Sequence, residues 1–175
     1  EGGVMTFTAD GYDLGGDALV FSWDFGDDSS VVTGDPVTTT DSATHTYAAD
    51  GSYTVTVTVS DGETCGVDSS TLVVQVTNDS PVIVSTTNDG PQPEGSPMTM
   101  SAVATDPGGD TVTFTWNFGD GSGAVTGDEV THVYGAEGTF VVNITAADGE
   151  GGTTQTTMNV EVTNAAPSIV SITPD

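Results

Sequence analysis

The sequence contains no lysine and no arginine among its 175 residues. It has 26 Asp plus Glu and 2 His, so its formal net charge at neutral pH is -26. Proteins bind phosphate backbones through cationic side chains that release counterions, so this composition excludes nucleic acid as a partner. It also excludes chemistry that needs an arginine clamp or a lysine Schiff base.

Cysteine and long apolar runs are scarce as well. The only cysteine, Cys65, has no partner for an internal disulfide, and Gly152 takes the matching place in the second half of the chain. No apolar run approaches the roughly 20 residues that a membrane span needs, and the sequence from Glu1 onward shows no charged-then-apolar signal pattern. We therefore expect no membrane span. Hydrophobic residues make up 35% of the chain, which is enough for small β cores.

The chain repeats itself, and a repeat defines the domain organisation. Residues 1–23 match residues 94–116 at a constant offset of 93, and residues 45–47 match residues 132–134 at an offset of 87. The first copy is therefore longer than the second in the segment after its tryptophan. We predict one domain for each copy.

Apolar and polar residues alternate with a period of two in each copy, which predicts strands with one buried face. Gly and Asp separate these stretches and provide turns. The fold class is therefore all-β, with two tandem β-sandwiches of about 85 to 90 residues each. The alternating stretches are 19–25, 53–59 and 72–76 in the first copy and 112–118, 140–146 and 158–162 in the second.

One motif resembles the signature of the PKD (polycystic kidney disease) domain family: Trp-Asp-Phe-Gly-Asp-Asp at 23–28, repeated as Trp-Asn-Phe-Gly-Asp-Gly at 116–121. A His-x-Tyr, a Gly-x-aromatic and an Asp-Gly follow in both copies, so the resemblance covers nearly the whole chain twice. It implies immunoglobulin-like sandwiches with Trp23 and Trp116 in their cores, of a kind found as extracellular modules. Asp28 replaces the glycine of the motif, and we expect the fold to tolerate it.

The two ends of the chain complement each other. Residues 164–171 match residues 78–85 at an offset of 86, so 164–175 is predicted to be a linker plus the first strand of a following copy. Repeat 1 spans 1–77 and lacks its own first strand, and repeat 2 spans 78–163. The residues expected to form a strand between subunits are Pro167, Ile169, Val170 and Ile172.

Two arrangements explain these ends. The chain is either one period of a long covalent array or a subunit whose terminal strand completes the next chain. Both predict a head-to-tail contact of the chain with further copies of itself, and hence a fibre. A plain truncated piece is the third reading.

Acidic residues gather at turns, and hard oxygen ligands of this kind suit Ca²⁺, which takes six to eight of them. Two carboxylates stand four residues apart in a Gly-rich turn of each copy. The family resemblance implies that calcium, where present, lies near the linker. Ordinary solvated turn residues with bonds to backbone N–H groups are the alternative. The expected ligands are Asn78, Asp79, Asp106, Asp110 and Asp148 around repeat 2, and Asp13, Asp17 and Asp61 with Asn164 of a preceding unit around repeat 1.

Three further residues are assigned from local pattern. Asn143 begins an Asn-Ile-Thr glycosylation acceptor on an outward strand position, so glycans are expected there. His45 and His132 occur once per domain beside a tyrosine, and we expect them to be structural rather than metal ligands.

No arrangement of nucleophile, base and oxyanion donor is apparent, so we expect no enzymatic activity. The chain is predicted to be a structural repeat of an extracellular or cell-surface filament, stalk, adhesin or surface layer, assembling head-to-tail with cation-stiffened linkers. The alternative is a protein- or carbohydrate-binding accessory module of a secreted enzyme. That role needs exposed aromatic residues, and only Tyr12 falls outside the inward positions.

Overall fold

The computed structural model describes residues 1–37, 39–63 and 66–172. The chain divides into two compact units, of which the first comprises Glu1–Asp79 and the second begins at Ser80. Strands are the only regular elements of the described residues, and none of these residues forms a helix of the length and apolarity that a bilayer crossing requires. Cys65 and the end of the predicted terminal strand, 173–175, lie outside the described residues.

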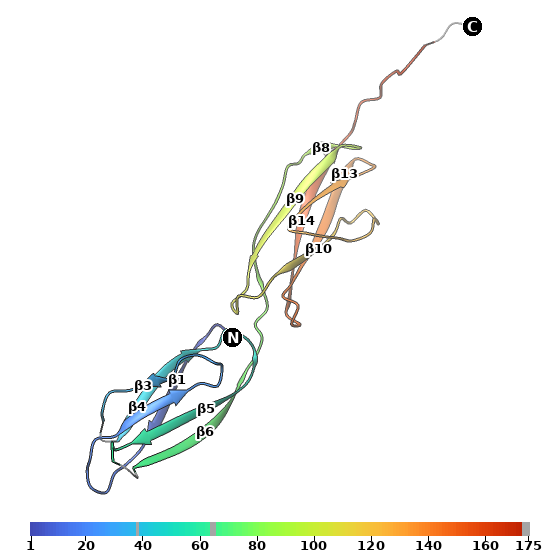
Figure 1. Cartoon of the computed structure of the whole chain (residues 1–175). Coiled ribbons are helices and arrows are strands. Elements are labelled where there is room, and N and C mark those ends of the chain that lie inside the picture. Colours follow the sequence, from blue (N-terminus) through green and yellow to red (C-terminus); the bar gives the residue numbers. More distant parts are fainter. Residues whose placement is uncertain (38, 64–65, 173–175) are drawn as a thin grey trace. The chain divides into compact units, whose positions relative to one another are not determined.

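The first unit is a sandwich of two antiparallel sheets (Figure 1). One sheet has two strands, β1 and β4, and the other has four in the order β3-β2-β5-β6. The strands are β1 (Val4–Asp10), β2 (Val20–Asp24), β3 (Val32–Thr33), β4 (Thr40–Thr46), β5 (Gly51–Ser60) and β6 (Val67–Val76).

The second unit repeats this arrangement with two additional strands. Its sheets have three strands, β12-β9-β7, and five strands, β11-β10-β13-β14-β8. The strands are β7 (Val82–Asn88), β8 (Gln92–Pro93), β9 (Pro97–Thr105), β10 (Thr113–Asn117), β11 (Val125–Thr126), β12 (Glu129–Val133), β13 (Gly138–Ala147) and β14 (Thr153–Thr163).

The repeat aligns β1 with β9, β4 with β12, and β6 with β14. Strands β7 and β8 have no counterpart among the described residues of the first sandwich. The predicted all-β fold of two sandwiches is confirmed.

The shared motif forms the centre of each core. Trp23 and Phe25 are buried, as are Trp116 and Phe118, because residues two apart on a strand face the same side. The hydroxyl of Tyr47 donates a hydrogen bond to the carbonyl of Phe25 at 3.0 Å, and the second sandwich contains the equivalent bond. Core packing is therefore the role of the two tryptophans, as predicted.

The glycine that follows the aromatic pair is required by its surroundings. Gly26 has a φ of +74°, in the left-handed region, and a Cβ atom there would lie 2.5 Å from the carbonyl oxygen of Thr54. Gly119 occupies the same position against Val141. Only glycine accepts both the backbone conformation and the close approach.

Asp28 adopts the left-handed conformation that the motif normally assigns to glycine. Its φ is 62°, and the equivalent Gly121 has a φ of 84°. The turn is therefore conserved between the copies although its residue differs, as expected from the sequence. An L-residue in this region costs about 1–2 kcal/mol, and less for Asp than for most others.

We predict that Asp28→Gly increases the free energy of unfolding of the first sandwich by about 0.5–1 kcal/mol, because relief of the backbone strain exceeds the added entropy of the unfolded chain. The reciprocal change, Gly121→Asp, should destabilise the second sandwich by a similar amount. Differential scanning calorimetry of both full-length variants measures these shifts. A destabilised Asp28→Gly variant would contradict the strain assignment.

Candidate functional site

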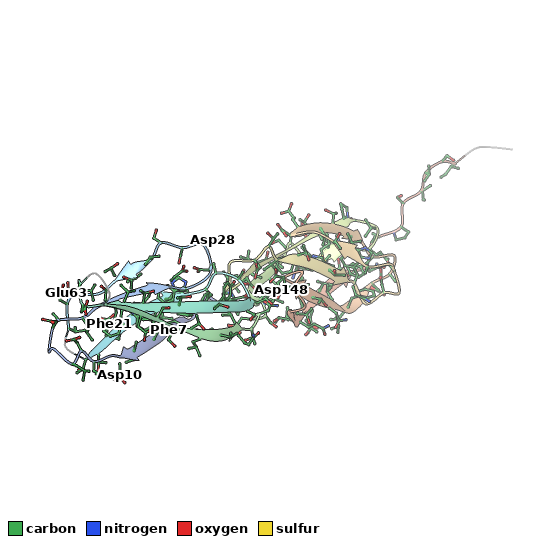
Figure 2. The ribbon with its side chains drawn as sticks, turned by 60° about the horizontal axis from the view of Figure 1, so that its bottom comes forward. Phe7, Asp10, Phe21, Asp28, Glu63 and Asp148 are labelled. Atoms are coloured by element: carbon green, nitrogen blue, oxygen red, sulfur yellow. The ribbon has the colours of Figure 1, made fainter. Side chains whose placement is uncertain are left out.

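The first sandwich is open on one side. No strand among the described residues pairs with the second edge of β1, and a cavity of about 710 Å³ opens between β1 and β6. Phe7 and Phe21, from strands β1 and β2, lie in its wall and are labelled in Figure 2. Other lining residues are Met5, Ala9, Val57 and Leu72.

The exposure of equivalent residues shows that the core of the first sandwich is incompletely covered. Leu72 on β6 is 58% exposed, whereas the equivalent Met158 on β14 is 8% exposed. Met5 on β1 is likewise exposed, whereas the equivalent Met98 on β9 is buried. An apolar face beside an unpaired strand edge favours the addition of a further strand.

Strand β7 closes this side of the second sandwich. It pairs antiparallel with β9, with Ile83 opposite Ala104, and Ile83 packs against the core. Two hydrogen bonds tie β7 to β14: Thr154 Oγ1 donates to the Pro81 carbonyl at 2.5 Å, and Asn88 Nδ2 donates to the sulfur of Met158 at 3.3 Å. The second sandwich therefore shows what fills such a groove.

The predicted inter-subunit strand is exposed and belongs to no sheet. Ile169, Val170 and Ile172 are 82%, 94% and 85% exposed, and Pro167 is exposed as well. Residues 164–172 form no strand, so the pairing of this segment with another unit stays a prediction.

The acidic turns form the same local structure in both copies. The backbone N–H of Asp17 donates to Asp13 Oδ1 at 3.1 Å, and that of Asp110 donates to Asp106 Oδ1 at 3.4 Å. These are the carboxylate-to-backbone bonds that solvated turn residues make.

The aspartates that end the long strands also organise turns. Asp148 is buried, and its Oδ1 accepts the N–H groups of Glu150 and Gly152 at 2.8 and 3.0 Å. Asp61 Oδ1 accepts the N–H of Glu63 at 2.8 Å. In the first sandwich, Asp13 and Asp61 line one cavity of about 230 Å³, and their joint role as calcium ligands stays a prediction.

The remaining predicted calcium ligands lie at the chain segments that leave each sandwich. Asn78 and Asp79 follow β6, and Asn164 follows β14 and is exposed. Within either sandwich taken alone, the described residues contain no three Asp, Glu, His or Cys whose ligand atoms all lie within 4.8 Å of one another. An ion held by one sandwich would therefore need backbone carbonyls or water, and the ligand set stays a prediction.

Sequence analysis missed the role of a repeated glutamate. Glu94 Oε2 accepts the N–H of Glu137 at 3.0 Å, and its Oε1 accepts the N–H of Ala165 at 3.4 Å. In the first sandwich Glu1 Oε1 accepts the N–H of Asp79 at 3.0 Å. Each carboxylate thus holds the segment that leaves its sandwich, and the matched Glu-Gly pairs of the repeat were the available signal.

Each histidine contacts an aspartate side chain and packs against an aromatic ring, which agrees with the structural role predicted for it. His45 Nε2 lies 2.6 Å from Asp27 Oδ2, and His132 Nε2 lies 2.7 Å from Asp120 Oδ2. The His132 ring stacks on Phe118 with a centroid separation of 3.9 Å. The Trp-Asn-Phe-Gly-Asp-Gly motif at 116–121 therefore provides both the Phe118 ring and the Asp120 carboxylate that orient His132.

The same network lowers the pKa of Asp120. The hydroxyl of Ser122 donates to Asp120 Oδ1 at 2.6 Å and is the largest cause, burial acts in the opposite direction, and His132 contributes as well. Together they lower this pKa to about 2. The serine binds the carboxylate and not the imidazole, so the group is not arranged as a nucleophile and base.

Two surface positions match their predictions. Asn143 is exposed on β13, as an acceptor of a glycan must be, although its modification stays a prediction. Tyr12 is the large exposed aromatic residue that the sequence pattern had set apart.

We predict that Asp120→Asn makes the stability of the second sandwich less dependent on pH. A carboxylate with a lowered pKa stabilises the fold fully above its unfolded value near 4, and that contribution is lost as pH falls toward 2. The variant should lose about 1–3 kcal/mol at pH 7 and show a shallower decline between pH 4 and 2.

Urea unfolding at each pH measures both effects. Glu129→Gln, which neutralises an exposed carboxylate on β12, serves as the control and should retain the wild-type profile. Parallel pH profiles for Asp120→Asn and the wild type would refute the assignment.

Known proteins resemble each copy separately. A family model described as "PKD domain" matches residues 1–76 and 78–163. A microbial collagenase of Vibrio alginolyticus is 38% identical over 87 residues, which is 50% of this chain and 11% of the collagenase. The matched part is thus a small fraction of that protein's length.

Two solved domains also match. The PKD1 domain of Vibrio anguillarum Epp is 24% identical with a TM-score of 0.44, covering 51% of this chain and 100% of that domain. The PKD domain of the human VPS10 domain-containing receptor SorCS2 is 18% identical with a TM-score of 0.41, covering 54% of this chain and 84% of that one.

Proposed function

Because this chain belongs to the PKD domain family, we propose that it is a structural repeat of an extracellular protein that assembles head-to-tail. The domains of this family are accessory modules without catalysis of their own, and the collagenase relative contains one within a much larger protein. These relatives support a secreted or cell-surface location. Each sandwich then acts as a rigid spacer.

The observation that carries the proposal is the uncovered β1 edge of the first sandwich. It leaves an apolar cavity of about 710 Å³ beside the unpaired edge of β1, whose other edge pairs with β4. The same chain has an exposed segment, 164–172, that matches the strand filling the equivalent groove of the second sandwich. Addition of an extended segment to a free sheet edge is an established mode of recognition. Because donor and acceptor are different surfaces, the contact does not close and generates a fibre.

The charge of the chain supports a cation-dependent assembly. With 26 acidic and no basic side chains apart from two histidines, neighbouring copies repel one another unless cations bind. Ca²⁺ fits the available oxygen ligands, and we assign it to the residues at the ends of the sandwiches, with Asp13 and Asp61 lining one cavity.

A second candidate function is that of a protein- or polysaccharide-binding accessory module. Tyr12 and the exposed Leu14 lie together in the loop after β1, where they offer an apolar contact. A collagenase relative is compatible with such a role. The assembly proposal is preferred because it accounts for the open groove, which the binding role leaves unexplained.

Head-to-tail assembly predicts particles larger than one chain under native conditions. Analytical ultracentrifugation of the full chain should show a series of species that grows with concentration, whereas mass spectrometry under denaturing conditions should return 17.6 kDa for separate chains. Deletion of 164–175 should leave only monomers, because it removes the donor segment. Both sandwiches should still fold, since residues 164–172 make no strand in either of them. A wild-type chain that stays monomeric at every concentration would refute assembly.

Cation binding predicts a calcium-dependent melting temperature. Saturating Ca²⁺ should stabilise the chain by about 2.7 kcal/mol at a hundredfold excess over Kd, and a chelator should reverse the effect. Asp106→Asn should reduce the shift, whereas neutralising the exposed Asp50 should not. Equal melting temperatures with Ca²⁺, with Mg²⁺ and with chelator would remove calcium from the proposal.

A further inference from the structure

The groove of the first sandwich and the terminal segment have a defined register. Resting on the assembly proposed above, we infer that residues 167–172 of a second copy of this chain bind antiparallel to β1, with Ile169 opposite Gly11 and Ile172 opposite Ala9. Ile169 and Ile172 enter the cavity, and Val170 faces solvent. Ile169 and Ile172 are therefore the side chains that determine the specificity of this strand.

The register follows from the pairing observed in the second sandwich. There, Ile83 lies opposite Ala104 and Thr86 lies opposite Ala102. The acceptor strands β1 and β9 are related by the repeat offset of 93, and the donor segments by the offset of 86. Transferring both offsets places Ile169 opposite Gly11 and Ile172 opposite Ala9.

A bulge in β7 decides which side chains point inward. The register shifts between Ile83 and Ser85, so Val84 is left out of the ladder and is 61% exposed. Ile83 and Thr86 on either side of it are partly buried. Their equivalents, Ile169 and Ile172, are therefore the inward residues, and Val170 occupies the outward position of the bulge.

The open groove has room for these larger side chains. Thr86 is replaced by the bulkier Ile172, and Gly11 has no side chain where the second sandwich has Ala104. A Cβ atom on Gly11 would lie 3.0 Å from the Phe21 ring, so the Phe21 side chain takes the place that the Ala104 methyl group has in the second sandwich. Apolar side chains of β1 and β6 line the space that the isoleucines would occupy.

The charge of the segment favours it as the occupant. Two aspartates, Asp10 and Asp68, line the groove. Residues 164–172 contain no charged side chain, whereas the equivalent residues 78–86 of the second copy include Asp79, which Ala165 replaces. A neutral strand enters an acidic groove without the repulsion that a charged segment of this chain would meet.

One hydrogen bond of the second sandwich has no equivalent in the groove. Thr154 donates to the carbonyl of Pro81, but the matching residue of the first sandwich is Asp68, which has no proton to donate when ionised. Added strands should therefore be held less tightly than β7. Replacing Asp68 with threonine should restore the donor, remove one repulsive charge, and tighten binding of Pro167 and the residues after it.

A synthetic peptide of residues 164–172 tests the register on the full-length chain. Trp23 lines the cavity, so its fluorescence should report binding at protein concentrations too low for assembly. We expect Val170→Asn in the peptide to change the dissociation constant by less than about threefold, and Ile169→Asn or Ile172→Asn, which add no charge, to weaken binding at least about tenfold. Asp68→Thr in the protein should strengthen binding of the unchanged peptide about tenfold.

The outcomes separate the register from the proposed function. Equal losses for Val170→Asn and Ile169→Asn, or no binding of the native peptide, would overturn the register even if the chain forms fibres. A peptide that binds in the expected order to a chain that never assembles would retain the register and refute the fibre. If the groove is instead filled by the chain's own tail, the double variant Ile169→Asp/Ile172→Asp of the protein will bind the peptide more tightly than the wild type, and this result would overturn the second copy as donor.

Discussion

Coverage of an apolar β-sandwich face by a strand is the constraint on which the rest of the structure depends. In the second sandwich β7 supplies its backbone to β9 and its Ile83 side chain to the core, and the methionines beneath it are buried. In the first sandwich the same face lies open, and Leu72 is exposed as a result. Burial of apolar surface contributes about 25 cal/mol per Å², so an uncovered groove of this size is a site at which a complementary strand gains stability.

The chain carries almost only negative charge, and this limits which segments can cover the open face of the first sandwich. The chain has no lysine or arginine with which to form ion pairs, so its carboxylates bind backbone N–H groups, the two histidines, or cations. Asp148 and Glu94 show the first of these solutions, and Asp27 and Asp120 show the second. The uncharged terminal segment fits the same logic, because a partner of an acidic groove must itself lack negative charge.

Sequence patterning predicts the fold of this chain well because one buried face alternates on each strand. The tryptophan motif, the repeat and the outward Asn143 all follow from a period of two and fixed offsets. Contacts between segments far apart in sequence could not be predicted in this way. The hydrogen bond that the N–H of Ala165 donates to Glu94 depends on where the folded chain brings backbone groups. The calcium ligands were chosen from residue type and the family resemblance, and the inter-subunit strand from the repeat offset of 86, so their partners stay predicted.

Amide hydrogen exchange on β1 tests the central claim most directly. If a strand from another copy covers this edge, the outward amides at the Ala9–Gly11 end of β1 should exchange slowly in assembled protein and quickly in the variant that lacks 164–175, while β9 remains equally protected in both. Fast exchange on β1 in the full-length chain at high concentration would show that its edge remains open, and would contradict the account.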